Sequence, residues 1–260
     1  MQHLKLFSAI IVSAFLLSAC SGNTTANTNK DSVSQTSSSL SGSGDDMYYE
    51  LTTTSTGKNL TMNGITKMYV SSKGDMRVEM NFTNSMSPDK KADPIIIIGH
   101  SDKPDESISI DDSAKTYSIN HISADELNSG EKTQSTATKI GEEKILGFNC
   151  VHARIISTKK IGNFYSETDT IDLWRSNDVP MQANVKDLFD KFQSRTGNFM
   201  YTPETEAQLK AMGCEGFMTK MEMKNKNVSM TMQLTKSEHR NLSADMFQIP
   251  EGYTEDKNGL

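Results

Sequence analysis

The chain alternates between apolar and polar residues over long stretches, and a period of two is typical of β-strands with one buried face. Within positions 75–82 the apolar side chains at every second position are Met76, Val78, Met80 and Phe82. A similar alternation returns over 217–224 and over 228–235. The polar residues at 224–227 lie between these two segments, so we expect a hairpin with a short turn.

Further segments of the same kind bring the expected total to about 11 strands. The expected strands span 47–56, 60–72, 75–82, 94–100, 107–111, 115–120, 138–148, 150–157, 164–174, 217–224 and 228–235. Gly64 inside the second strand predicts a bulge. Apolar residues recur at helical spacing at Val185, Leu188, Phe189 and Phe192, and Pro203 opens a second short helix that ends near Met212.

Composition indicates a soluble globular body of one domain over residues 47–260. Hydrophobic residues make up 35% and charged residues 23% of the chain, and the formal net charge is −6. The lysines are scattered, whereas nucleic-acid binding requires a concentrated basic face. We therefore expect no nucleic-acid partner.

The N-terminus has the pattern of a secretory signal: a short basic start, an apolar run over 6–17, and then Leu17-Ser18-Ala19-Cys20. That ending resembles the lipobox of bacterial lipoproteins. The resemblance implies that residues 1–19 are removed and that Cys20 carries diacylglycerol and palmitate as a membrane anchor. The alternative is an ordinary signal peptide with a chance cysteine. Residues 20–46 are mostly Ser, Thr, Asn and Gly, which predicts a disordered tether.

The residue after Cys20 bears on the membrane that the chain reaches. By resemblance to the enterobacterial sorting rule, an Asp there implies retention at the inner membrane, whereas this chain has Ser21. We therefore expect a lipid-anchored protein of the cell envelope, at the outer membrane and facing the periplasm.

Three sequence runs carry a resemblance to a known family. They are 141–150 (GEEKILGFNC), 171–174 (IDLW) and the ending 247–253 (FQIPEGY). Together they resemble an uncharacterised family of bacterial lipoproteins, domain of unknown function 4412, which is similar to the LolA/LolB-like superfamily of lipoprotein carriers. The resemblance implies a mainly β fold with minor α content: a curved antiparallel sheet, an incomplete barrel, whose concave side is covered by two short helices. It brings no catalytic residue.

Methionine is abundant, with 16 residues in the chain. Six of them fall on the expected inward faces of strands, and we take these as candidate ligand-cavity residues together with Trp174: Met76, Met80, Met221, Met223, Met230 and Met232. Methionine is unbranched and adaptable, which suits a surface that accepts lipid or lipoprotein acyl chains. Two alternatives stay open: the methionines fill an ordinary core, or the Met-x-Met pairs capture Cu(I). Trp174 has a packing alternative of its own.

Cys150 and Cys214 remain after the lipidated Cys20, and an even pair in an oxidising compartment predicts a disulfide. Two buried free thiols are the alternative.

Sequence motifs for catalysis are absent, including the G-x-S-x-G elbow, the phosphate loop and H-E-x-x-H. The separated histidines show no ligand spacing, so we expect no enzyme, no metal and no cofactor. Two function classes remain: a lipoprotein that binds a hydrophobic ligand, and a structural or protein-interaction lipoprotein with a filled core, whose partner the sequence does not identify.

Overall fold

The computed structural model describes residues 45–58, 60–85, 93–121, 133–161, 165–181 and 202–257. The described elements, in chain order, are β1 (Asp46–Gly57), β2 (Thr61–Val70), β3 (Met76–Asn84), β4 (Ile95–Gly99), β5 (Glu106–Asp111), β6 (Thr116–His121), β7 (Thr133–Ile145), β8 (Phe148–Ile161), β9 (Tyr165–Ser176), α3 (Pro203–Ala211), β10 (Phe217–Lys224), β11 (Val228–Arg240), the 3-10 turn η1 (Ala244–Phe247) and β12 (Thr254–Glu255). The expected signal peptide, Cys20, most of the tether and the expected helix around Val185 lie outside these residues.

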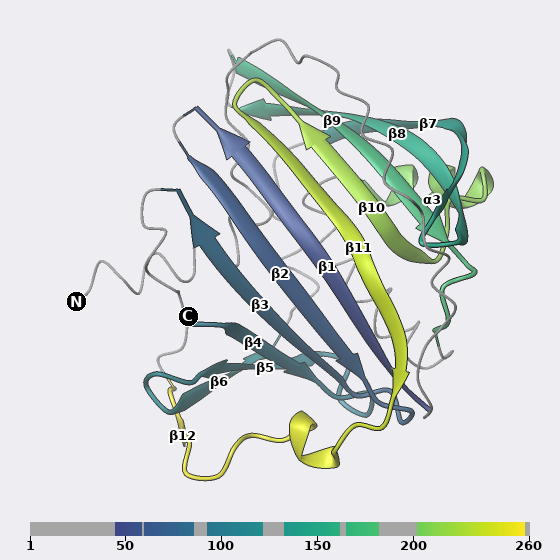
Figure 1. Ribbon diagram of the computed structural model, residues 1–260. Coiled ribbons are helices and arrows are strands. Elements are labelled where there is room, and N and C mark those ends of the chain that lie inside the picture. Colours follow the sequence, from purple (N-terminus) through teal and green to yellow (C-terminus); the bar gives the residue numbers. More distant parts are fainter. Residues whose placement is uncertain are drawn as a thin grey trace.

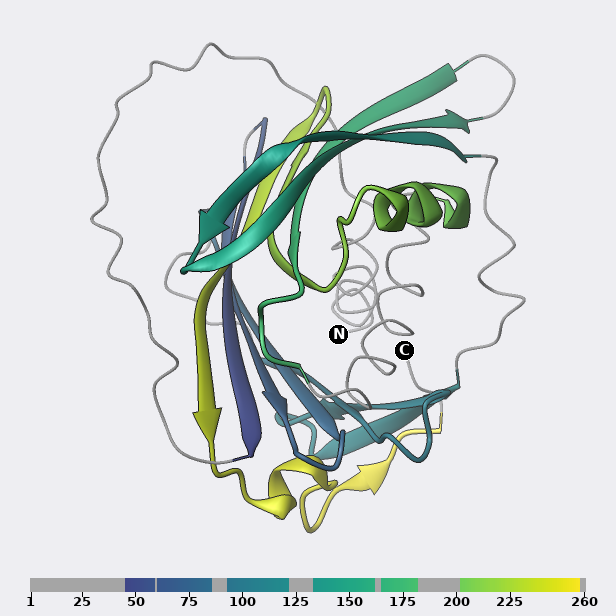
Figure 2. The ribbon, with the colours of Figure 1, turned by 90° about the vertical axis from the view of Figure 1, so that its right-hand side faces the viewer.

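The described strands form one sheet with the order β12-β6-β5-β4-β3-β2-β1-β11-β10-β9-β8-β7. Two meanders, β1 to β6 and β7 to β11, are joined where β1 pairs with β11. Every pairing is antiparallel except that of β12 with β6. The sheet curves strongly and does not close, as Figures 1 and 2 show. This confirms the expected mainly β fold and incomplete barrel. The described sheet has 12 strands, whereas the sequence predicts about 11.

Two glycines have local roles that the strand pattern does not reveal. Gly147 has a φ of 84° and follows Leu146 with a φ of 51°, so these two residues form the tight turn between β7 and β8. Gly64 does not form the expected bulge, because its pairing with Thr53 and Phe82 continues without a shift in register. A Cβ at Gly64 would lie only 2.4 Å from the Phe82 ring, so glycine is needed there for close packing.

The inner side of the curve, here called the concave face, carries the main apolar core. Tyr49 on β1 lies opposite Met68 on β2, and Leu51 lies opposite Leu234 on β11. These four side chains belong to one buried cluster. A second cluster is formed by β8, β9 and the β10–β11 hairpin, and Met232 packs against both. The two clusters therefore form a continuous apolar layer along the inside of the sheet.

Helix α3 lies inside the curve, beneath β7 to β9 (Figure 2). The Thr202 side chain caps its first turn, where Pro203 cannot donate a backbone hydrogen bond. Leu209 is fully buried in the second cluster. This confirms the expected helix from Pro203 as a cover of the concave side. No helix of the described residues is long and apolar enough to cross a membrane.

Polar contacts fix α3 to the sheet at two places. At the free edge of β7, the Ala137 backbone N–H donates to Gln208 Oε1 at 2.8 Å. From β9, the buried Arg175 Nη1 donates to both Glu206 carboxylate oxygens, at 2.8 and 3.1 Å. The helix thus satisfies edge groups of β7 and pairs a charge that would otherwise be costly to bury.

The outer side of β4 to β6 carries a separate apolar layer. Ile98 lies opposite Arg77, on the other side of the sheet from Val78, which lies opposite Ile97. The buried members of this layer are Ile96, Ile98, Ile108 and Ile110. Residues 95–98 are four consecutive isoleucines, and because side chains alternate along a strand, only Ile96 and Ile98 of this run belong to the outer layer.

The C-terminal segment covers this outer layer. Ile249 and Tyr253 pack against the isoleucines, and β12 pairs with β6 at the edge of the sheet. Lys115 Nζ donates to the Tyr253 hydroxyl at 2.8 Å, and that hydroxyl donates to Asp112. The FQIPEGY ending therefore seals an apolar surface of its own domain.

Candidate functional site

The methionines of the β10–β11 hairpin form two directly opposed pairs on the concave face. Met221 lies opposite Met232, and Met223 lies opposite Met230. We call these four residues the methionine cluster. Because directly opposed residues in an antiparallel pair share a face, all four point to the same side of the sheet. Leu173 and Ile171 of β9 lie opposite Met221 and Met223 and extend the same apolar surface.

The two remaining candidate methionines, Met76 and Met80, lie on β3 with Val78 between them, again on the concave face. All six methionines singled out from the sequence therefore share this face, on β3 and on the β10–β11 hairpin, which is far from β3 in the chain. Their exposure divides them into two groups. Met76, Met221 and Met230 are buried, with 3%, 4% and 6% of their surface exposed, whereas Met80, Met223 and Met232 are half-buried.

Trp174 does not belong to this surface, contrary to the sequence-based expectation. It follows Leu173 on β9 and so points to the outer face of the sheet. His152 stacks on its ring at a centroid distance of 4.0 Å, and Lys220 Nζ lies 4.3 Å from the ring centroid. The two neighbours come from the strands on either side, β8 and β10. A pocket of about 400 Å³ adjoins this group.

Charged side chains surround Trp174 on the outer face. The Asp172 carboxylate accepts from Arg154 Nε at 2.9 Å and Arg154 Nη2 at 3.0 Å, and its Oδ1 lies 2.8 Å from His152 Nε2. Lys220 pairs with Glu222 at 2.6 Å. Burial raises the pKa of Asp172, but the bonds from Arg154 and His152 outweigh it and hold that pKa below its usual value.

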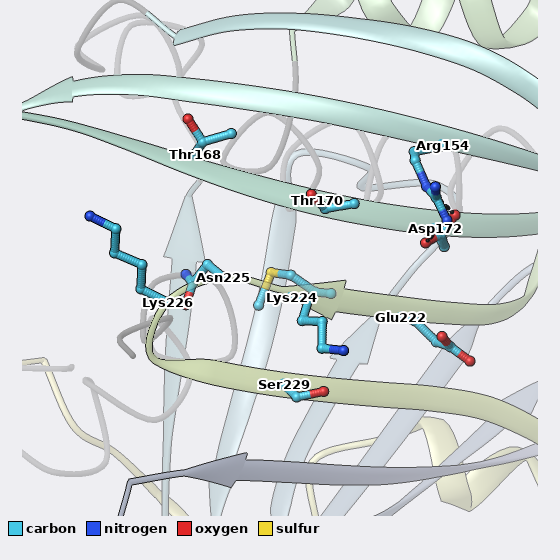
Figure 3. Close-up of a pocket in the computed structure, with 10 residues that line it drawn as sticks. Arg154, Thr168, Thr170, Asp172, Glu222, Lys224, Asn225, Lys226 and Ser229 are labelled. Carbon is cyan, nitrogen blue, oxygen red and sulfur yellow. Dashed lines mark hydrogen bonds and ion pairs between the residues drawn. The ribbon is translucent and has the colours of Figure 1, made fainter. Parts of the chain in front are cut away.

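A second pocket, with a volume of about 610 Å³, lies over these outer strands. Figure 3 shows Arg154 and Asp172 side by side on β8 and β9, with Glu222, Lys224 and Lys226 on the neighbouring β10–β11 hairpin. The Asp172 and Glu222 carboxylates are already neutralised by Arg154 and Lys220. This arrangement is a solvated network of ion pairs, and it was not foreseen because the partners are brought together only by strand register.

The predicted disulfide is not present, because Cys150 and Cys214 are both buried free thiols. They belong to different apolar clusters: Cys150 packs with Ile145 and Trp174, and Cys214 packs around Leu209. The Cys214 thiol donates to the Val151 carbonyl at 3.5 Å. Burial raises the pKa of Cys214 to about 11. Neither thiol has the lowered pKa of a reactive cysteine.

Within the described part of the chain, no group of three or more His, Cys, Asp or Glu side chains gathers in a way that could hold a metal ion. His100, His121 and His239 are separated from His152 along the sheet, on β-strands or turns of other regions. The four residues of the methionine cluster offer only thioether sulfur as a potential metal ligand.

The model of DUF4412, a domain of unknown function, matches residues 50–253. The match spans most of the chain, which therefore belongs to the DUF4412 family. No curated protein matches the sequence.

Similar solved structures come from several bacteria. A DUF1329 family protein from Desulfovibrio piger is 12% identical with a TM-score of 0.32, over 79% of this chain and 90% of that chain. A LolA superfamily protein from Nitrosomonas europaea is 7% identical with a TM-score of 0.32, over 78% and 90%. A putative outer membrane lipoprotein-sorting protein domain from Vibrio parahaemolyticus is 10% identical with a TM-score of 0.31, over 78% and 89%.

Proposed function

We propose that this chain is a non-catalytic lipoprotein of the cell envelope whose concave face binds a hydrophobic ligand, either a lipid or the acyl chain of a lipoprotein. The observation that carries the proposal is the methionine cluster: two opposed pairs, Met221 with Met232 and Met223 with Met230, on the inner side of a curved sheet.

Methionine is suited to such a face by its flexibility. Three rotatable bonds and a polarizable sulfur let the side chain fit varied apolar shapes, which a branched side chain cannot do. Met80, Met223 and Met232 are half-buried and lie on both sides of β1 and β2, so adaptable side chains line the concave face from β3 to β10. An acyl chain laid along this face would contact several of them at once.

The three buried methionines of the six support a second candidate function, a protein-interaction lipoprotein with a filled core. Met76, Met221 and Met230 are as buried as ordinary core residues. A lipoprotein with a filled core that binds a protein partner at the envelope would show the same burial.

Native mass spectrometry of the protein purified from its own envelope distinguishes these functions. We expect an added mass that collision releases as an acyl lipid. Met223→Gln, on the concave face, should reduce the adduct, whereas Glu222→Gln, its neighbour on the outer face of the same strand, should retain it. A wild-type protein with no adduct, or an adduct that survives Met223→Gln unchanged, would favour the protein-interaction function.

The envelope location rests on Cys20 and is proposed with it: a lipid anchor in the outer membrane, with the domain facing the periplasm. Two or more acyl chains give stable membrane attachment, since each buried methylene contributes about 0.8 kcal/mol. Cys20→Ser should therefore release the protein into the soluble fraction. Recovery of this variant in carbonate-washed membranes would refute the anchor.

A further inference from the structure

One polar side chain on the concave face, Thr53, is almost completely buried although its hydroxyl has no partner among the described residues. Thr53 lies in the middle of β1, opposite Met232 on one side and Gly64 on the other. Only 2% of its surface is exposed, and its Oγ1 has no hydrogen-bond partner among the residues that the structure describes. Leu51, two positions earlier on the same strand, belongs to the concave apolar core.

The Ser237 hydroxyl on β11 is also buried without a partner among the described residues, but the Ser237 side chain as a whole is only half-buried. Two hydroxyls of residues as fully buried as Thr53 do have partners. Thr219 Oγ1 donates to the Trp174 carbonyl at 3.2 Å, and Ser176 Oγ donates to the Asn149 carbonyl at 2.6 Å. Removing a hydroxyl from water without replacing its hydrogen bond costs folding free energy, whereas a valine of the same shape avoids that cost. An unsatisfied threonine at the centre of a sheet therefore needs an explanation.

The surroundings of Thr53 are apolar and adaptable. Gly64 has no side chain, and the Phe82 ring occupies the space beside it, so the ring lies on one side of the hydroxyl. Met232 lies on the other side and is half-buried. Because methionine changes rotamer easily, Met232 can move to admit a ligand atom to Oγ1. The result is a single hydrogen-bonding group within an apolar surface.

We propose that Thr53 Oγ1 donates a hydrogen bond to the carbonyl or carboxyl oxygen of an acyl ligand. The ligand class is then a fatty acid or a fatty acyl ester, rather than a hydrocarbon without polar atoms or a polyol that needs many partners. This inference rests on the proposed function, since it names the chemistry of the ligand that the concave face takes.

The test compares the binding of two fluorescent probes to the mature, secreted chain. The chain carries Cys20→Ser, so that the protein has no acyl chain of its own. Cis-parinaric acid has a polyene chain with a carboxyl group, and diphenylhexatriene is a hydrocarbon. Thr53→Val, which keeps the shape, should weaken cis-parinaric acid about three- to tenfold, the loss expected for one hydrogen bond. It should leave diphenylhexatriene unchanged. Thr53→Ser keeps the hydroxyl and should retain the affinity of the wild type for both probes.

Competition then separates the two ligand sources. If methyl palmitate displaces the probe as well as palmitic acid does, the ligand is an acyl ester. If palmitic acid alone displaces the probe, the ligand is a free fatty acid. Thr53→Val should weaken the binding of whichever competitor binds. Equal binding of cis-parinaric acid to wild type and Thr53→Val, or an equal loss for both probes, overturns the role of Thr53 while the proposed function stands. Binding of neither probe to the wild type overturns both.

Discussion

The sheet has two apolar surfaces, and they differ in what covers them and in the residues that build them. On the outer face of β4 to β6 the surface is isoleucine, and the chain covers it with its own C-terminal segment through Ile249 and Tyr253. On the concave face the surface of β3, β10 and β11 is rich in methionine; α3 packs over part of it through Leu209, and three of the six candidate methionines are half-buried.

The difference follows from side-chain flexibility. Isoleucine is stiff at χ1 and packs well against a cover of fixed shape, which the C-terminal segment provides. Methionine loses more rotamer freedom than isoleucine when it is fixed, so the burial of methionine under a permanent cover stabilises the fold less than the burial of an equally large stiff side chain. Under the proposed function, the isoleucine surface serves stability and the methionine surface serves a ligand whose shape varies.

The largest expected effect is in the C-terminal segment that covers the outer surface. Phe247, at the end of η1, is buried, and the neighbouring Met246 carbonyl accepts from Arg77 Nη1 at 3.1 Å on the outer face of β3. Phe247→Ala should lower the free energy of unfolding by about 3 to 5 kcal/mol, because a large buried ring leaves a cavity. Urea unfolding followed by circular dichroism measures it.

Probe binding tests whether the two surfaces are independent. Phe247→Ala should bind cis-parinaric acid as the wild type does at temperatures where it is folded, since the turn η1 that carries Phe247 contacts β3 through Arg77 on the outer face, on the other side of the sheet from the methionine cluster. A loss of binding in the folded variant would break the distinction between a stabilising surface and a binding surface.

The methionine cluster itself should show two sizes of effect. Met230→Ala should cost about 2 to 3 kcal/mol, because its side chain is buried in the second cluster. Met223→Ala should cost about 1 kcal/mol, because the half-buried side chain leaves a smaller cavity, and it should still weaken uptake of a fatty-acid probe. Losses above about 3 kcal/mol at both positions, with no probe binding by the wild type, would indicate a closed core on both faces.

Strand alternation predicts much of this arrangement from the sequence. It places the six methionines on one face and locates the β10–β11 hairpin with the observed bounds of β10. It places Trp174 wrongly, since the expected site grouped it with the methionines although Leu173 is the residue of β9 that lies opposite Met221. Strand β12 was not predicted, because two residues cannot show a period.

Thr53 shows a different limit of sequence reasoning. It lies in a run of threonines and serines, 52–56, where every residue is polar and no alternation marks which side chains are buried. Only its pairing with Met232 and Gly64 places its hydroxyl on the concave face. The Arg154–Asp172 ion pair was missed for the same reason, because register between β8 and β9 cannot be read from either strand alone.

The smallest expected effect concerns the outer face of β8 to β10, which carries charges where β4 to β6 carry isoleucine. The pKa of Asp172 is held below its usual value, since the bonds from Arg154 and His152 outweigh the effect of burial. A carboxylate with a lowered pKa in the folded state stabilises the fold above its unfolded pKa of about 3.9, and this contribution disappears as the pH falls through the folded value. The wild type should therefore lose about 1 kcal/mol more of its free energy of unfolding than Asp172→Asn does between pH 7 and strongly acidic pH.

The exposed turn variant Asp102→Asn should follow the wild type, and probe binding at pH 7 should be equal in all three. If the difference in the free energy of unfolding between the wild type and Asp172→Asn stays constant down to pH 2, Asp172 stabilises the fold through packing and not through charge. The outer face of β8 to β10 would then stabilise the fold by packing, as the covered isoleucine surface does.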